Sequence, residues 1–182
     1  MGLDMYLEGE TFAGLQFEHN RETAGASFTG DLAHVQPERL SSVTEQLGYW
    51  RKANAIHKWF VDNVQGGVDD CRRAPVSRAK LTELRAVVER VLASCQLAPG
   101  PVINGYQSDP SFVTGWRPMI EDGKIVVDPS VAEELLPATS GFFFGSTQYD
   151  SRYVDDLKNT LAIIDAALSC HDSVSFFYEA SW

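Results

Sequence analysis

The sequence predicts an α+β fold, a single domain of residues 1–182 in which a small sheet packs against three longer helices. Apolar and polar residues alternate near both ends, in residues 2–8 and 173–182, as in half-buried strands. Three segments with helical periodicity lie between them, at residues 49–64, 77–95 and 150–168. We expect the first and last strands to be neighbours in one sheet, and their relative direction stays open.

The N-terminal third is predicted to hold the first strand, a glycine-containing stretch and a short helix. The strand buries alternate residues from Leu3 to Leu7. Residues 9–36 contain four glycines and scattered phenylalanines, which fit short strands and an ordered loop equally well. Pro37 is then expected to open a short helix that ends near Gly48.

Residues 49–64 form the most residue-specific segment of the chain and are predicted to be a core helix. At about 100° per residue, one apolar stripe collects Tyr49, Ala53, Ile56, Phe60 and Val64. The helix is expected to end at Gly66 and Gly67, because paired glycines permit the positive φ of a C-terminal cap.

The middle of the chain is predicted to contain a helix, a break and a hairpin. Ser77 caps the helix of residues 77–95, and the Pro-Gly-Pro run at 99–101 breaks the chain after it. Residues 118–128 are typical of a hairpin whose tight turn is the Asp-Gly pair at 122–123.

Two further helices precede the last strand. Asp128 and Pro129 suit the N-cap and first position of a short helix that runs to Leu136. Asp150 is expected to cap a long last helix. The inward side of that helix is predicted to be Tyr153, Leu157, Thr160, Leu161, Ile164 and Leu168.

Composition bounds the function without naming it. The 25 acidic and 15 basic residues give a formal net charge of -10, which disfavours duplex nucleic acid because phosphate neutralisation needs a basic face. The first ten residues have no basic region or apolar run, so we expect a cytoplasmic protein without a signal peptide or membrane span. Three cysteines and four histidines show no zinc spacing, and neither a metal nor a cofactor is expected.

The flanks of the 49–64 segment carry the first candidate ligand site, formed by Trp50, Arg51, Asn54 and His57, with Lys52 beside them. Arginine offers a planar fork for carboxylate or phosphate, asparagine offers a donor and an acceptor, and tryptophan offers a stacking face. This set would suit a nucleotide-like ligand. The alternative is that Arg51 is a solvated charge and His57 a packed helix residue.

The second candidate site is the segment 141–150, in which three phenylalanines lie between glycines and precede a helix. Such a position offers hydroxyls and free backbone amides to an anion. The predicted ligand-binding residues here are Phe144, Ser146, Thr147, Tyr149 and Asp150. The alternative is a buried strand with an ordinary helix cap, although Phe142 to Phe144 cannot all point into one core.

Adjacent Asp69 and Asp70 are the last chemical signal. Neighbouring carboxylates can hold a divalent metal or act as general acid and base. Alone, they are more often ordinary loop acids, and we assign them no metal.

Four blocks resemble a family of uncharacterised proteins found in tailed-phage and related bacterial genomes: MGLDMYL, GYWRKANAIHKWF, SGFFFGSTQYD and FFYEASW. The linking regions do not contribute to the resemblance. It implies a small phage-type accessory protein in the host cytoplasm that acts on host metabolism or defence, and it transfers no catalytic residue.

The leading hypothesis is a protein that binds a small polar or nucleotide-like ligand without turnover and sequesters a host signal. It requires the Asn54 flank and the Ser146 segment, far apart in the chain, to frame one cavity. A small hydrolase or transferase with His57 as general base, oriented by Asp70 or Asp150, is the first alternative. An acidic inhibitor of a host protein complex is the second. A homo-oligomer stays open.

Overall fold

The structure, a computed structural model, describes residues 2–21, 30–141 and 143–182. In chain order its elements are β1 (Asp4–Phe12), α1 (Glu18–Arg21), the 3₁₀ turns Gly30–Leu32 and Pro37–Arg39, β2 (Ser42–Arg51), α2 (Asn54–Asn63), β3 (Ala74–Val76), α3 (Arg78–Ser94), β4 (Leu97–Ser108), β5 (Trp116–Val126), α4 (Ser130–Leu135), α5 (Ser151–Ser169) and β6 (Val174–Ser181). Helices and antiparallel sheets are mixed, which confirms the α+β prediction.

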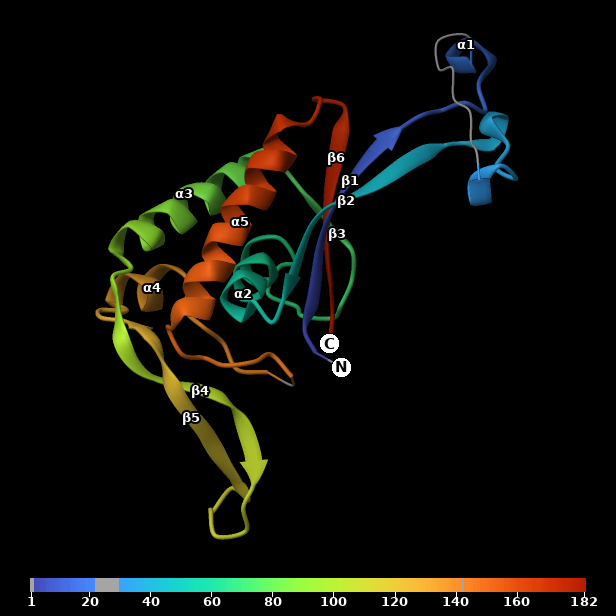
Figure 1. Ribbon diagram of the computed structural model, residues 1–182. Helices are drawn as coiled ribbons and strands as arrows, with labels where there is room; N and C mark the ends of the chain where they lie inside the picture. Colours follow the sequence, from blue (N-terminus) through green and yellow to red (C-terminus); the bar gives the residue numbers. More distant parts are fainter. Residues whose placement is uncertain (1, 22–29, 142) are drawn as a thin grey trace.

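An antiparallel sheet with strand order β2-β1-β6-β3 forms one layer, and α2, α3 and α5 lie together to one side of it (Figure 1). The first and last strands are neighbours, as predicted. Asp4 lies opposite Ser181 and Thr11 opposite Val174, so their direction is antiparallel. The two ends of the chain therefore meet at one end of the sheet, beside the start of α2.

The core lies between this sheet and the helices. Leu3, Met5 and Leu7 of β1 are completely buried, which confirms the predicted face of the first strand. Phe60 of α2 stacks on Tyr178 of β6 with ring centroids 4.0 Å apart. Burial of this alternating face supplies most of the driving force for folding, because it removes large apolar surfaces from water.

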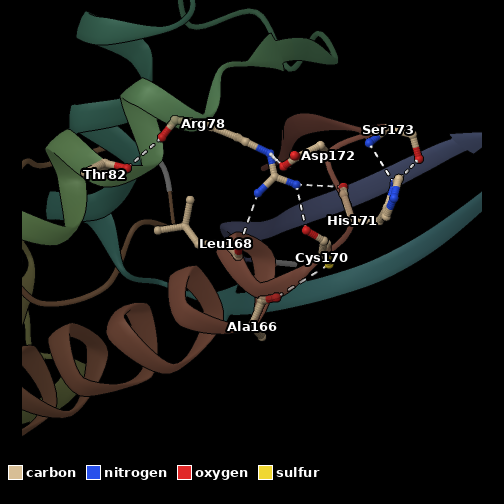
Figure 2. A network of polar contacts seen from close by, with 8 residues as sticks. All are labelled: Arg78, Thr82, Ala166, Leu168, Cys170, His171, Asp172 and Ser173. Atoms are coloured by element: carbon tan, nitrogen blue, oxygen red, sulfur yellow. Dashed lines mark hydrogen bonds and ion pairs between the residues drawn. The ribbon is translucent and has the colours of Figure 1, made fainter.

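Arg78 joins the beginning of α3 to the end of α5 (Figure 2). Its guanidinium donates hydrogen bonds to the carbonyl oxygens of Leu168, Cys170 and His171, at 3.1, 2.8 and 2.7 Å. The last carbonyls of a helix lack partners within the helix and lie at its negative end. One cation satisfies both conditions here and fixes α5 against α3.

The predicted helix of residues 49–64 is wrong in its first third. Tyr49, Trp50 and Arg51 belong to β2, where Arg51 pairs with Asp4 of β1. Lys52 has a φ of 61° and separates the strand from α2, which begins at Asn54.

The predicted Pro37 helix is a single 3₁₀ turn for the same reason, since β2 already begins at Ser42. Strand pairing with β1 overrides the local helical pattern.

The predicted break at 99–101 and the turn at 122–123 are also wrong, because both lie inside the long hairpin of β4 and β5. Gly100 and Gly123 are opposite each other across this hairpin. A Cβ on Gly100 would lie 2.7 Å from Ile125, so glycine admits the close approach of a neighbouring side chain. Prolines are tolerated because a two-stranded ribbon leaves outward N–H groups unpaired. The hairpin extends away from the sheet and helices (Figure 1).

The remaining helices agree with the sequence. Ser77 caps α3 through a hydrogen bond from the Lys80 amide, and Asp150 caps α5 by accepting from the amides of Arg152 and Tyr153. The short helix α4 begins at Ser130, slightly later than predicted. The open stretch 9–36 contains the end of β1 and α1, and its residues 22–29 lie outside the described residues.

Candidate functional site

A cavity of about 520 Å³ lies where four segments meet: the end of β2 with the start of α2, the loop 138–148, the start of α5, and β4. Its volume falls in the range of about 300–1,000 Å³ that small-molecule sites occupy. Its polar and aromatic lining residues include Arg51, Lys52, Asn54, Asn104, Tyr106, Phe143, Phe144, Ser146, Gln148, Asp150, Arg152, Tyr153 and Asp156.

Asn54, the first residue of α2, holds the loop that forms one wall. Its amide nitrogen donates to the carbonyl oxygens of Phe144 and Ser146, at 3.1 and 2.8 Å. Its amide oxygen accepts from the backbone N–H of Thr139 at 3.0 Å. The Asn54 flank and the Ser146 segment therefore meet at a cavity, as the sequence analysis required. Both amide hydrogens are used by the loop, so Asn54 builds the wall and is not free to donate to a ligand.

Tyrosine hydroxyls fix the segment on either side of this wall. Tyr149 accepts a hydrogen bond from the Ala138 amide at 3.1 Å, and Tyr153 donates to the Leu136 carbonyl at 2.9 Å. Burial raises the pKa of the Tyr153 phenol far above its usual value, so this hydroxyl keeps its proton. Hydrogen bonds between these side chains and the main chain thus hold the wall along its length.

Two cations lie on the β2 side of the cavity. The Arg51 side chain is 61% exposed. Its guanidinium lies 3.9 Å from the Asp4 carboxylate, a long contact that leaves most of its hydrogen-bonding capacity unused. Lys52 forms no ion pair within the described ranges 2–21, 30–141 and 143–182. Its side-chain stem lies beside Gly145, where an added Cβ would be 3.1 Å from the Lys52 Cβ. Both cations can meet an anionic group.

Backbone strain is concentrated beside this cavity. Among the described residues, the non-glycine residues with positive φ are Lys52, Cys71 and Phe143, and the first and last of these line the cavity. Lys52 is held there because its N–H donates to the Leu3 carbonyl and its carbonyl accepts from the Asn54 N–H, each at 2.8 Å. Such strain persists only where surrounding contacts enforce it, and it is common at functional sites.

The α5 side of the cavity has two carboxyl groups, Asp150 and Asp156, beside the Arg152 cation. Asp150 is 2% exposed; its Oδ1 accepts from the amides of Arg152 and Tyr153 at 2.8 and 3.2 Å. Asp156 lies on the next turn but one of α5. Burial, followed by the charges of Asp150 and Asp155, raises the pKa of Asp156 to about 7. The cavity therefore has two cations on its β2 side and two carboxyl groups beside one cation on its α5 side.

The β4–β5 hairpin closes a third side. The Gln148 side chain accepts from the Ile103 N–H at 2.7 Å. Arg152 donates to the Ile103 carbonyl and to the Asn104 side chain, at 3.2 and 3.1 Å. These contacts fix the hairpin beside the cavity and bring in Tyr106, whose ring is 59% exposed.

Of the predicted site residues, Arg51, Asn54, Phe144, Ser146 and Asp150 line the cavity. Trp50 does not. It is 1% exposed in the core and donates its indole N–H to Thr160 at 2.9 Å, because its side chain on β2 points toward α5. Phe144 is 6% exposed and packs edge-on against His57, so it forms wall and not a free stacking face.

His57 also lies outside the cavity lining. It is 1% exposed, with Nδ1 2.7 Å from the Tyr178 hydroxyl and Nε2 2.9 Å from Asp69 Oδ2. Burial raises the pKa of Tyr178 well above its usual value, so its phenol stays neutral. The neighbouring carboxylate is Asp69, not the predicted Asp70, which pairs with Arg72 at 3.4 Å. Both ring nitrogens already have partners, so neither is free to accept a substrate proton.

Thr147 and Tyr149 do not line the cavity. Thr147 is exposed, and the Tyr149 ring packs against Tyr153 with centroids 4.9 Å apart. The expectation for Phe142 falls outside the described residues, but its neighbour Phe143 is 47% exposed at the cavity.

Sequence reasoning missed Tyr106, Gln148, Arg152 and Asp156 as site residues. Asp156 had a signal: it follows Tyr153 by three positions and therefore flanks the inward stripe of the last helix. Tyr106 had none, because its strand was interpreted as a loop-rich connection.

No group of three or more His, Cys, Asp or Glu side chains suited to a metal ion occurs in the part of the chain that the structure describes. Within the same residues, no helix is long and apolar enough to cross a membrane. Comparison with protein-family models found no match, and neither did comparison with curated proteins or with solved structures.

Proposed function

We propose that this protein binds a small anionic, nucleotide-like ligand in the cavity between α2, the 138–148 loop, α5 and β4, without turning it over. The single observation that carries the proposal is the Asn54 clamp. The buried Asn54 side chain makes three hydrogen bonds to the main chain of the loop. These bonds hold the loop around the cavity, so the loop does not collapse into it. A largely pre-formed cavity is the usual form of a small-molecule site.

The anionic group is assigned to Arg51 and Lys52. The guanidinium of Arg51 can form paired hydrogen bonds to phosphate, and Lys52 adds a point charge held in place by its strained backbone. The overall charge of -10 repels anions at long range, so this local pair of cations is needed for the ligand to bind.

The flat part of the ligand is assigned to Phe143 and Tyr106. Each residue is about half exposed, and the two come from different segments of the cavity lining, the loop and the hairpin. Exposed aromatic rings stack on nucleobases with little sequence preference. Trp50 and Phe144, the stackers expected from the sequence, are replaced in this role because both are buried by protein.

Binding without turnover is supported by the position of His57. A general base needs a free acceptor within reach of the substrate, whereas both ring nitrogens of His57 have partners and the ring is absent from the cavity lining. With the resemblance of four sequence blocks to phage-type proteins, this favours sequestration of a nucleotide-like signal in a host cell over hydrolysis.

Titration calorimetry and thermal unfolding with a panel of nucleoside monophosphates test the proposal. Ligand at a hundred times its Kd should stabilise the protein by about 2.7 kcal/mol, equivalent to an increase in Tm of about 5–10 °C for a chain of this size. Chromatography of the same mixtures should show the nucleotides unchanged. Absence of heat and of any Tm change across the panel would contradict the proposal.

Two variants separate the site from the general charge of the protein. Arg51→Gln should weaken nucleotide binding at least about fivefold, because it removes a charge-assisted hydrogen bond. Arg90→Gln, the same change on the exposed side of α3 and outside the cavity lining, should leave the affinity unchanged. Equal loss in both variants would show that binding follows net charge and not this cavity.

A further inference from the structure

A buried polar atom without a partner requires an explanation, because leaving such an atom unpaired costs free energy. Two such side-chain atoms occur among the described residues, Asp150 Oδ2 and Gln65 Oε1. Gln65 lies in the turn after α2 and does not line the cavity. Asp150 does line it.

The two oxygens of Asp150 have different surroundings. Oδ1 caps α5 by accepting from the amides of Arg152 and Tyr153, and this cap is the structural role of the residue. Oδ2 takes no part in the cap and has no hydrogen bond from any described residue, although the residue is 2% exposed. A carboxylate only accepts hydrogen bonds, so its partner must be a donor.

We propose that the ligand presents an amino N–H group to Asp150 Oδ2 at the α5 side of the cavity while its anionic group meets Arg51 and Lys52. The inference rests on the proposed function and narrows it to a class of ligand. Among nucleotides, it selects those whose base carries an exocyclic amino group over those that carry only oxo groups or none.

Asp156 reinforces this choice. It lines the same cavity, and burial together with Asp150 raises its pKa to about 7. Near neutral pH its carboxyl is therefore protonated in a large share of molecules, and it can donate to a ring nitrogen while accepting from an amino group. A base edge with adjacent amino and ring-nitrogen atoms offers both partners.

Three matched pairs of ribonucleoside monophosphates test the inference in the wild-type protein by calorimetry. Adenosine is compared with unsubstituted purine, guanosine with inosine, and cytidine with uridine. The first two pairs differ at the amino group alone, whereas uridine also carries a hydrogen on ring N3 and is the oxo-for-amino comparison. In at least one pair the amino-bearing member should bind at least about tenfold more tightly, because its analogue leaves the buried carboxylate unpaired.

Asp150→Asn is the sharpest variant. Asparagine caps helices as well as aspartate does, and its amide replaces the acceptor at Oδ2 with a donor when Oδ1 keeps the cap. The preference for the amino-bearing member should fall below about twofold or reverse toward the oxo analogue. Asp122→Asn makes the same change at an exposed aspartate on β5, outside the cavity lining, and should leave the preference intact. If Asp150→Asn does not fold, the wild-type pairs still decide.

The outcomes separate the two claims. Equal affinity within all three pairs would overturn the amino assignment while the proposed function stands. Failure of every nucleotide to bind would overturn both. Stabilisation by Mg²⁺ or Mn²⁺ alone, lost in Asp150→Asn, would overturn the amino assignment in favour of a metal.

Discussion

Two buried polar clusters are centred on residues of α2 that are three positions apart, Asn54 and His57. The clusters differ in what surrounds them. At His57, the imidazole contacts both Tyr178 and Asp69, and the Trp182 indole also donates to Asp69 at 3.1 Å. At Asn54, the amide holds a loop that borders an open cavity, whose lining also includes Asp150 with its unpaired oxygen.

The difference teaches that residue type alone does not locate a site. A histidine beside a carboxylate has the composition of a catalytic pair, yet its partners satisfy it inside the core. An asparagine and a helix-capping aspartate have an ordinary composition, yet they border the cavity with an unfilled acceptor. An unpaired buried atom is therefore the more informative observation, because native proteins contain few of them.

The largest expected effect is at the closed cluster. His57→Ala should lower the free energy of unfolding by about 3 kcal/mol, because it opens a cavity and leaves the buried Tyr178 hydroxyl without its partner. Nucleotide affinity of the folded protein should change less than about fivefold, because the histidine makes no hydrogen bond to the cavity. Urea unfolding and calorimetry on the same preparation measure both quantities.

Asn54→Ala is the matched change at the open cluster. It should lower stability by about 2 kcal/mol and also weaken nucleotide binding at least tenfold, since the loop 139–146 loses its clamp. Hydrogen exchange of that loop should become faster in Asn54→Ala and stay slow in His57→Ala. If His57→Ala instead abolishes binding with little change in stability, the comparison is wrong and His57 acts on the ligand.

A smaller effect is expected at Asp156 on the α5 side of the cavity, which should make the free energy of unfolding depend on pH. The pKa of Asp156 rises from 3.8 to about 7 on folding, so between these values the folded protein holds a proton that the unfolded chain releases. The contribution of Asp156 is therefore fully present below pH 4 and is lost as pH rises to about 7, by at most about 1.4 kcal/mol per pH unit.

Urea unfolding of Asp156→Asn checks that sign. Asparagine resembles the protonated acid, so the variant should match the wild type near pH 4 and exceed it at pH 8 by about 2 kcal/mol. Asp122→Asn on the exposed part of β5 is the control, and it should differ from the wild type by the same amount at both pH values. A variant that is less stable than the wild type at pH 8 would mean that Asp156 is ionised and paired in the folded protein.

Periodicity located much of this fold because several segments follow a single pattern from end to end. The alternation from Leu3 to Leu7 identified β1, and the stripes of α3 and α5 identified both helices with their caps at Ser77 and Asp150. The meeting of Asn54 and Ser146 was also predicted, although as ligand contacts and not as a clamp. In each case the local sequence and the tertiary environment favour the same structure.

The sequence misled where the two disagree. Residues 49–64 have a helical stripe, but Tyr49 to Arg51 are stabilised more by pairing with β1 than by continuing a helix. The residue type of Lys52 does not indicate its positive φ. In the hairpin, the Asp-Gly pair at 122–123 is a strong turn signal that is overridden because Gly123 faces Gly100 across the strands. Pairing partners distant in sequence decide both cases, and a pattern confined to one segment does not contain them.

Lys52 itself yields the smallest and most discriminating prediction. Its φ of 61° favours glycine, so Lys52→Gly relieves backbone strain in the folded protein, while glycine also makes the unfolded chain more flexible. The free energy of unfolding should therefore rise by about 0.5–1 kcal/mol or stay unchanged. The same change should weaken binding of the anionic group at least threefold, because it removes a cation. Lys124→Gly on β5, where the backbone is extended, should lower stability and leave binding intact. Weaker binding without a loss of stability in Lys52→Gly would show that the strained backbone is retained for the ligand and not for the fold. A loss of stability equal to that of Lys124→Gly would assign Lys52 to the fold alone.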